Sequence, residues 1–256
     1  MNLALFISGG GSTAQAVIQS AQNGLLQGLV NPVLVISSNP NAEGMQKAKD
    51  LGIPVEVIQR ENYTNQESFG KVLLEILHKY QVNFISQNGW LPLTPKSVVA
   101  KFHKKIINQH PGPLDPGKPD FGGKGMYGAR VICARIIYAM LTQEAHPSTE
   151  ATTHFVTEEF DNGDLLRVKR LAFEVLHTGI QSITIEQDRD LQSYIQHKTE
   201  EMQKALLPLE HENVIATLAD ITKGTIPHFQ RTEQLIPEEN KEMLLQAKGL
   251  VIKLFQ

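Results

Sequence analysis

The sequence predicts an α/β fold: a mostly parallel sheet flanked by helices, followed by a helical C-terminal extension. In the N-terminal half, short apolar runs alternate with longer segments whose apolar residues recur at the spacing of one helix face. Strands that alternate with helices of this length form right-handed units with parallel neighbours. In such sheets ligands bind beyond the carboxyl ends of the strands, so functional residues are expected in the loops that follow them.

Each expected strand is a short apolar run closed by turn-forming residues such as glycine, proline, asparagine or serine. The run at 82–86, for example, precedes the loop that holds the only tryptophan. The expected strands are 3–7, 33–36, 53–58, 82–86, 106–110, 152–157 and 165–175, and the helices between them are 14–25, 42–51, 66–80 and 129–141.

The C-terminal part is expected to be helical. A long segment with many charges on one face is expected at 183–207, Pro208 interrupts it, and the helical pattern resumes at 214–219. A final helix is expected at 241–255, and the tail from residue 224 onward carries no catalytic constellation. This organisation predicts one main domain at residues 1–182, with residues 183–256 packed on it as a helical segment.

Composition and charge exclude several classes of protein. Of the 256 residues, 41% are hydrophobic and 20% are charged, which is typical of a soluble globular protein. A formal charge of −3 gives no basic field for nucleic acid or an anionic membrane. The single cysteine, Cys133, excludes an intrachain disulfide and suits a reducing compartment, and its apolar helical surroundings indicate core packing. No signal-peptide pattern is found and no apolar run approaches the roughly 20 residues that span a bilayer, so a cytoplasmic protein is expected.

A glycine-rich turn between the first strand and the first helix is a candidate phosphate site. Gly10 and Gly11 let backbone N–H groups approach an anion, and Ser12 or Thr13 is placed to cap the helix that follows. The alternative is a tight turn that needs glycine only for its geometry. The dinucleotide pattern fits loosely, because Ala14 stands in the place of its third glycine. These residues therefore favour the phosphate of a small substrate over a dinucleotide.

Asn108 and His110 are the strongest candidates for catalysis. They stand two residues apart on an extended run, so their side chains point to the same side of the sheet. An amide and an imidazole aimed at one spot can polarise a carbonyl and move a proton. The alternative is a strand end at which the asparagine opens a turn and the histidine caps the chain. The shared edge with the glycine turn and the loop at 87–93 favours the catalytic interpretation.

Four further features are placed near the same edge. Trp90 begins an apolar loop suited to a flat heterocycle, although a lone tryptophan is more often a core residue. Asp161 lies in an Asp-Asn-Gly turn signal; it either forms the turn or orients His110 and raises its pKa. His154, in the middle of an expected strand, is assigned a structural hydrogen-bonding role. The glycine-rich stretch at 115–128 is either a substrate-closing loop or a poorly ordered connection.

Three motifs, in this order, resemble those of the glycinamide ribonucleotide formyltransferases and their folate-dependent relatives. They are Ile7-Ser8-Gly9-Gly10-Gly11-Ser12, Asn108-Gln109-His110-Pro111 and His154-Phe155-Val156-Thr157-Glu158-Glu159-Phe160-Asp161-Asn162-Gly163, and the resemblance covers residues 1–220. It implies a Rossmann-like scaffold on which a formyl group passes from 10-formyltetrahydrofolate to a substrate amine, with residues 1–182 as the catalytic domain.

The resemblance also implies a role for each motif. The catalytic set is Asn108, His110 and Asp161. Substrate phosphate binding falls on Gly10, Gly11, Ser12 and Thr13. Folate binding falls on Trp90, Leu91, Pro92, Leu93, Thr157, Glu158, Glu159 and Phe160. The expected partners are these two small molecules, with no nucleic acid, membrane or metal, and a monomer or homodimer is expected.

In the implied reaction the amine attacks the formyl carbon, and negative charge develops on the carbonyl oxygen. Asn108 and a protonated His110 would stabilise that oxyanion, each by about 3 kcal/mol. Asp161 would keep His110 charged and help to relay the proton of the amine, directly or through water.

The sequence departs from the family pattern on the acceptor side. Thr13 stands where the family usually has asparagine, Gly112-Pro113-Leu114-Asp115 replaces Ser-Leu-Leu-Pro, and Gln203-Lys204 replaces a Glu-His pair whose glutamate helps bind the ribonucleotide. Glycinamide ribonucleotide, in purine biosynthesis, is the leading acceptor. The open alternatives are another amino-sugar or amino-nucleotide, hydrolysis of 10-formyltetrahydrofolate, and a non-catalytic folate- or nucleotide-binding module.

Overall fold

One seven-stranded sheet organises the protein, whose computed structural model describes residues 1–176 and 180–255. The strand order is β3-β2-β1-β4-β5-β6-β7; pairs among β1 to β5 are parallel, whereas β6 pairs antiparallel with β5 and β7. The predicted mostly parallel α/β fold is confirmed. The strands are β1 (Asn2–Ile7), β2 (Asn31–Ser37), β3 (Val55–Val57), β4 (Phe84–Asn88), β5 (Ile106–His110), β6 (Ser148–Phe155) and β7 (Leu165–Ala172).

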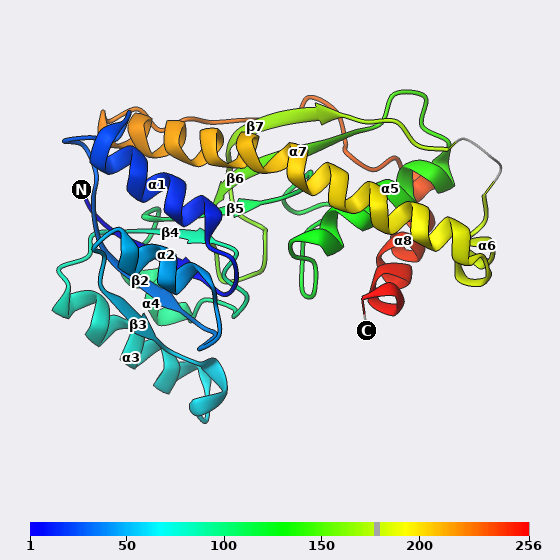
Figure 1. The fold of residues 1–256 in the computed structure, drawn as a ribbon. Helices are drawn as coiled ribbons and strands as arrows, with labels where there is room; N and C mark the ends of the chain where they lie inside the picture. Colours follow the sequence, from blue (N-terminus) through cyan, green and yellow to red (C-terminus); the bar gives the residue numbers. More distant parts are fainter. Residues whose placement is uncertain (177–179, 256) are drawn as a thin grey trace.

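Helices cover both faces of this sheet (Figure 1). They are α1 (Ser12–Asn23), α2 (Gly44–Asp50), α3 (Gln66–Lys79), α4 (Lys96–Lys101), α5 (Ala129–Thr142), α6 (Ser182–Gln187), α7 (Arg189–Thr222) and α8 (Lys241–Leu254), with short 3-10 turns at Arg60–Asn62 and Glu238–Asn240. Along β1, Leu3, Leu5 and Ile7 join the core beneath α1 and α7, whereas Ala4 and Phe6 join the core beneath α3 and α4. Because both faces are buried, the strand is a continuous apolar run rather than an alternating one.

The predicted interruption at Pro208 is wrong. α7 continues through the proline as a single helix from Arg189 to Thr222. Pro208 is exposed, whereas Leu206 and Val214 on the inner face are fully buried. The proline removes one backbone donor, but packing along the apolar face stabilises the helix on both sides of it.

A third core lies beneath the C-terminal helices. α5 packs against both α7 and α8, and Phe121 and Phe173 are buried in the same cluster. In Figure 1, α7 crosses the molecule from α6 to α1, and α8 leads to the C-terminus. The C-terminal helices therefore pack on the sheet domain, whereas the division at residue 182 stays a prediction. Residues 177–179, inside the first expected unit, and residue 256 lie outside the described residues.

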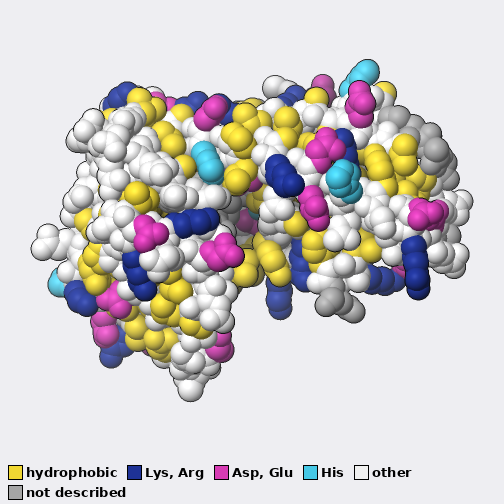
Figure 2. All heavy atoms as spheres, in the orientation of Figure 1, with side chains coloured by type: hydrophobic (Ala, Val, Ile, Leu, Met, Phe, Trp, Pro, Cys, Tyr) yellow, Lys and Arg dark blue, Asp and Glu magenta, His cyan; other side chains and the backbone are white. Residues whose placement is uncertain are grey.

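The surface carries mixed charge. On the face shown in Figure 2, basic and acidic side chains are interspersed rather than gathered into a patch of one sign. Among the described residues, no helix combines the length and the apolar composition needed to cross a membrane. Cys133 is buried in the core, as its apolar surroundings predicted.

Candidate active site

The predicted ligand-binding segments meet at one edge of the sheet. The glycine turn follows β1, the loop at 89–93 follows β4, and Asn108 and His110 lie at the end of β5. Since β1, β4 and β5 are neighbours, their carboxyl ends lie side by side, and the shared edge predicted for these segments is confirmed. The backbone N–H of Leu91 donates to Ser8 Oγ at 2.9 Å, which ties the first two segments together.

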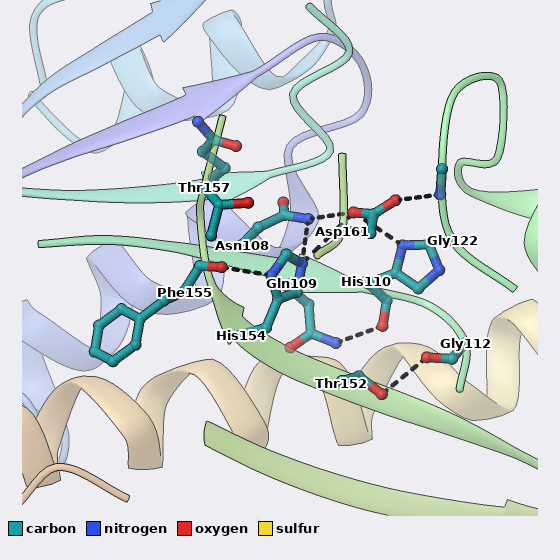
Figure 3. Close-up of polar contacts among 12 residues, drawn as sticks. Asn108, Gln109, His110, Gly112, Gly122, Thr152, His154, Phe155, Thr157 and Asp161 are labelled. Carbon is teal, nitrogen blue, oxygen red and sulfur yellow. Dashed lines mark hydrogen bonds and ion pairs between the residues drawn. The ribbon is translucent and has the colours of Figure 1, made fainter. Parts of the chain in front are cut away.

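Asn108 and His110 both approach one carboxylate oxygen of Asp161 (Figure 3). Asn108 Nδ2 donates to Asp161 Oδ1 at 3.4 Å, and His110 Nδ1 lies 3.6 Å from the same oxygen. Both side chains therefore point to the same side of β5, as their spacing predicted. The His110–Asp161 separation is an ion-pair distance rather than a hydrogen bond, and catalytic contacts of this kind often tighten only when substrate binds. The three residues are together; their catalytic roles stay a prediction.

His154 belongs to the same cluster, although its sequence position indicated only a structural role. It lies directly opposite Asn108 in the β5–β6 ladder. Its Nδ1 donates to the Phe155 carbonyl at 2.8 Å, and its Nε2 lies 3.1 Å from Asn108 Nδ2, within hydrogen-bond distance. Nε2 also lies 3.5 Å from Asp161 Oδ1. His154 opens the third family motif, but its place in the expected strand indicated no contact with Asn108, because the register between the two strands sets that contact.

The turn after β6 presents Asp161 to this cluster. Its φ of +53° is left-handed, a conformation that aspartate tolerates in turns. The Gly123 N–H donates to Asp161 Oδ2 at 2.9 Å. Glycine is needed nearby, because a Cβ on Gly122 would lie 2.7 Å from Asp161 Cβ and one on Gly163 would lie 1.8 Å from the Phe155 oxygen. Asp161 is thus both the turn residue and the carboxylate beside His110.

Burial and charge set the protonation of the cluster. Burial on its own would raise the pKa of Asp161, but His110, His154 and the Gly123 N–H together hold that pKa well below its ordinary value. Burial lowers the pKa of His110, and the Asp161 carboxylate offsets this only in part. Asp161 raises the pKa of His110, as expected, but desolvation outweighs this one carboxylate 3.6 Å away, so the net shift is downward. The shifted pKa values favour an ionised Asp161 and a neutral His110 at neutral pH.

Two cavities meet at this cluster. One, of about 40 Å³, lies between the loops that follow β4 and β6. The other, of about 230 Å³, lies on the side of the glycine-rich loop at 123–128. Trp90, Asn108, Phe160 and Asp161 line both cavities, so the cluster forms part of the wall between them. Two reactants can therefore reach the same polar groups from different sides.

Most residues predicted to bind folate line the smaller cavity, but two do not. Those that line it are Trp90, Pro92, Leu93, Thr157, Glu159 and Phe160. Leu91 lines the larger cavity instead, and Glu158 is exposed and forms an ion pair with Lys96. Four residues at the smaller cavity were not predicted as site residues: Gln87, Thr94, His154 and Val156.

Trp90 is both a core residue and a wall of the two cavities. Its ring lies 4.8 Å from that of Phe6 and stacks on that of Phe69 at 6.4 Å. This packing confirms the core interpretation and fixes one side of the site. On the smaller cavity's wall, Gln87 Nε2 donates to Thr94 Oγ1 at 2.6 Å; polar residues of this kind at a strand end give no distinctive sequence signal.

The glycine turn resembles an anion site but lacks the predicted cap. α1 begins at Ser12, and its N-cap is Gly11 with a left-handed φ of +64°, so neither Ser12 nor Thr13 caps the helix. Gly11 is required by packing, because a Cβ there would lie 2.6 Å from Gly44 Cα. Within the part of the chain that the structure describes, α1 has no side-chain cap, and Gly10 is exposed, so the N–H groups of this turn can approach a phosphate. Phosphate binding by the four predicted residues stays a prediction.

The glycine-rich stretch at 115–128 is packed rather than detached. Phe121 and Met126 are buried in the core beneath α5 and α8. The Asp120 carboxylate accepts hydrogen bonds from the backbone N–H groups of Asp115, at 2.9 Å, and Gly122, at 2.8 Å. The interpretation as a poorly ordered connection is therefore wrong; the stretch is a folded wall of the larger cavity.

The fold and the cluster define a class of protein. A doubly wound sheet that gathers an amide, an imidazole and a carboxylate beyond its carboxyl edge is suited to transfer at a carbonyl group. The formyl transferase family model matches residues 1–192 of the chain. The chain belongs to the formyl transferase family.

Curated relatives include a phosphoribosylglycinamide formyltransferase and a trifunctional purine biosynthetic protein. The chain is 34% identical over 165 residues to the chloroplastic phosphoribosylglycinamide formyltransferase of Arabidopsis thaliana, an alignment that covers 64% of this chain and 52% of that protein. It is 30% identical over 164 residues to the trifunctional purine biosynthetic protein adenosine-3 of Bos taurus, covering 64% of this chain and 15% of that protein. The chain thus spans about half the length, or less, of these relatives.

Solved structures share the fold. The phosphoribosylglycinamide formyltransferase of Bacillus halodurans has a TM-score of 0.67 at 24% identity, covering 90% of this chain and 100% of that one. The glycinamide ribonucleotide transformylase 1 of Symbiobacterium toebii has a TM-score of 0.68 at 20% identity, covering 90% and 94%. At these identities the likeness supports the Rossmann-like fold alone.

Proposed function

We propose that the protein transfers the formyl group of 10-formyltetrahydrofolate to the amine of glycinamide ribonucleotide, a step of purine biosynthesis. The observation that carries the proposal is the cluster of Asn108, His110 and Asp161 at the junction of two cavities. Membership of the formyl transferase family and the names of the relatives support it. We further propose a cytoplasmic monomer or homodimer whose partners are these small molecules.

The smaller cavity is the proposed site of the folate ring. Trp90, Pro92 and Leu93 supply an apolar wall, and Thr157 and Phe160 face them from the loop after β6. Ligand pockets usually measure about 300 Å³ or more, whereas this cavity holds about 40 Å³. Binding therefore requires the two loops to move apart, and we expect the folate to enter by that opening.

The cluster would act on the attacking amine and on the developing oxyanion. Asn108 Nδ2 turns from Asp161 and His154 to donate to the oxyanion, which is worth about 3 kcal/mol. His110 Nε2 is buried and has no hydrogen-bond partner among the described residues, and Nδ1 faces Asp161. Since the lowered pKa of His110 favours its neutral form, we assign it the role of base: Nε2 takes the amine proton, and the ionised Asp161 stabilises the imidazolium that results. When the oxyanion collapses, the bond from the formyl carbon to the folate nitrogen breaks, and the imidazolium gives its proton to that leaving nitrogen. This replaces the protonated starting state expected from the sequence.

The larger cavity is the proposed site of the acceptor amine. Lys124 lines it and is exposed, so its charge is available to a phosphate or carboxylate on the acceptor. The turn at Gly10 and Gly11 is the proposed phosphate site. A second candidate keeps the folate donor and changes the acceptor to another phosphorylated amine. It is favoured by the folded loop after Gly112, which departs from the family pattern and walls this cavity.

One assay separates these candidates. The purified protein is mixed with 10-formyltetrahydrofolate and with glycinamide ribonucleotide, with a panel of other phosphorylated amines, or with no amine. We expect a formylated product from glycinamide ribonucleotide at the highest kcat/KM of the panel. A higher kcat/KM for another amine would move the proposal to the second candidate. Equal release of tetrahydrofolate without an amine would indicate hydrolysis and contradict both.

A further inference from the structure

One peptide unit connects the C-terminal helix to the carboxylate of the site. Lys248, on α8, donates from Nζ to the Gly122 carbonyl at 2.8 Å. The N–H of Gly123, which belongs to the same peptide unit as that carbonyl, donates to Asp161 Oδ2 at 2.9 Å. An ammonium group and a carboxylate therefore hold the two ends of one peptide dipole. Charge-assisted hydrogen bonds in series strengthen one another, so this arrangement fixes the peptide plane and the carboxylate together.

The surroundings of Lys248 show that its position is specific. The side chain is half-buried; burial lowers its pKa, and the charges of Asp120 and Asp161 oppose that shift. Gly122 is buried against the Asp161 Cβ, at a spacing that admits no side chain. A small displacement of this peptide would therefore displace the carboxylate.

The other end of the same loop is held by the chain between α7 and α8. Arg231 Nε donates to the Leu114 carbonyl at 2.5 Å, and the backbone N–H of Leu235 donates to Asp115 Oδ2 at 3.0 Å. The loop from 114 to 123 is thus braced at both ends by residues beyond position 224. These bracing residues lie beyond residue 192, where the match to the formyl transferase family model ends.

We propose that Lys248 is a positioning residue for formyl transfer: through the peptide unit of Gly122 and Gly123, it holds Asp161 against His110. In this proposal the C-terminal helix α8 contributes a residue to a site whose other residues lie at the carboxyl edge of the sheet. The catalytic meaning of this proposal rests on the proposed function, whereas the coupling of Lys248 to the Gly123 N–H is testable without any substrate.

The test compares Lys248→Met with Lys253→Met. Lys253 lies on the same helix and pairs with Glu186 at 2.6 Å, away from the loop, so it controls for the loss of a lysine from α8. We expect Lys248→Met to lower kcat about 10- to 100-fold, the loss typical of a small misplacement of a reacting group. The KM for the folate and the melting temperature should match those of the control. Hydrogen exchange of the Gly123 amide should be faster in Lys248→Met only.

A double-mutant cycle shows whether Lys248 acts through Asp161. If it does, adding Lys248→Met to Asp161→Asn should change the residual kcat by less than about twofold, because the shared interaction is already lost. The proposal would be overturned if the loss of kcat in the double variant equalled the product of the losses in the two single variants. A wild-type kcat in Lys248→Met would overturn it as well. If the wild-type protein transfers no formyl group, the proposed function fails, and unchanged exchange of the Gly123 amide would separately overturn the coupling.

Discussion

His110 is buried with its Nδ1 facing the Asp161 carboxylate at 3.6 Å, so two opposing effects set its pKa. Desolvation disfavours the imidazolium, and the carboxylate favours it. We predict that NMR titration of the His110 ring gives a pKa below the ordinary 6.5. In Asp161→Asn the pKa should fall further, because the neutral amide no longer favours the charged ring. A wild-type value above 6.5 would restore the protonated starting state and contradict the role of base.

Asn108 presents its side-chain amide to the cluster from β5. Its Nδ2 contacts both His154 and Asp161, so it is held in place before substrate binds. We predict that Asn108→Ala lowers kcat about 100- to 1,000-fold, the usual loss for an oxyanion donor, with little change in the KM for folate. Asn83→Ala, at an exposed position just before β4, is the control. A mainly higher KM would show that Asn108 binds substrate rather than the transition state.

At the scale of single residues, the sequence was informative where local geometry decides. The two-residue spacing of Asn108 and His110 was enough to place both on one side of a strand. Asp161 was marked by its turn signal. His154 was missed as a member of the site, because its contact depends on the register between β5 and β6. The downward net shift in the His110 pKa was not predicted, because the desolvation of its ring depends on the whole core rather than on the nearest carboxylate.

The turn after β6 depends on Gly163. A Cβ there would lie 1.8 Å from the Phe155 carbonyl oxygen, which neither backbone can avoid without moving. We predict that Gly163→Ala lowers the free energy of unfolding by about 3 kcal/mol, the upper end of the usual range for one substitution. Urea unfolding monitored by circular dichroism measures this loss.

Gly249 is the matched control for that substitution. It lies within α8, and a Cβ there would meet nothing within 4 Å. Because alanine is a better helix former, Gly249→Ala should raise the free energy of unfolding by about 0.5–1 kcal/mol. If the two variants were equally stable, the close approach of Gly163 to Phe155 would not be what fixes the turn.

At the scale of elements, the periodicity of apolar residues predicted every strand of the sheet, with ends shifted by a few residues. Among the α-helices of the described residues, α4 was not predicted, because it is too short to produce a helical period. The extent of α7 was predicted wrongly, because tertiary packing overrides the local preference for a break at Pro208. The missing cap on α1 has a similar cause: Gly11 begins the helix because it packs against Gly44, which is distant in the sequence.

A buried ion pair joins the segment between α7 and α8 to the sheet. Arg231 pairs with Glu150 on β6, and the two side chains are only 7% and 4% exposed. Breaking a buried pair by removing one partner costs about 3–5 kcal/mol. For Arg231→Met we predict that the free energy of unfolding falls by an amount near the lower end of this range, because Arg170 still faces Glu150 at 3.3 Å.

The control for the ion pair is Lys169→Met. Lys169 pairs with Glu212, whose side chain is 62% exposed, and exposed pairs contribute about 0–1 kcal/mol. Differential scanning calorimetry of the two variants should show a much larger fall in melting temperature for Arg231→Met. Equal shifts would mean that the tail is not anchored through Glu150.

At the scale of the whole molecule, the alternation of strands and helices predicted the sheet, and the sheet predicted that the functional loops share one edge. The contacts between the tail and the loop from 114 to 123 were not predictable. They join residues more than a hundred positions apart, and their acceptors at Leu114 and Gly122 are backbone carbonyls, which no side-chain pattern marks.

The most direct test of the proposed function is the rate of tetrahydrofolate formation from 10-formyltetrahydrofolate, measured with and without glycinamide ribonucleotide. For the wild-type protein we predict a rate that depends on glycinamide ribonucleotide, with one formylated product for each tetrahydrofolate released. For a folded His110→Ala variant we predict a rate lower by orders of magnitude. A wild-type rate in that variant, or no response to glycinamide ribonucleotide in the wild-type protein, would contradict the assignment of this cluster to formyl transfer.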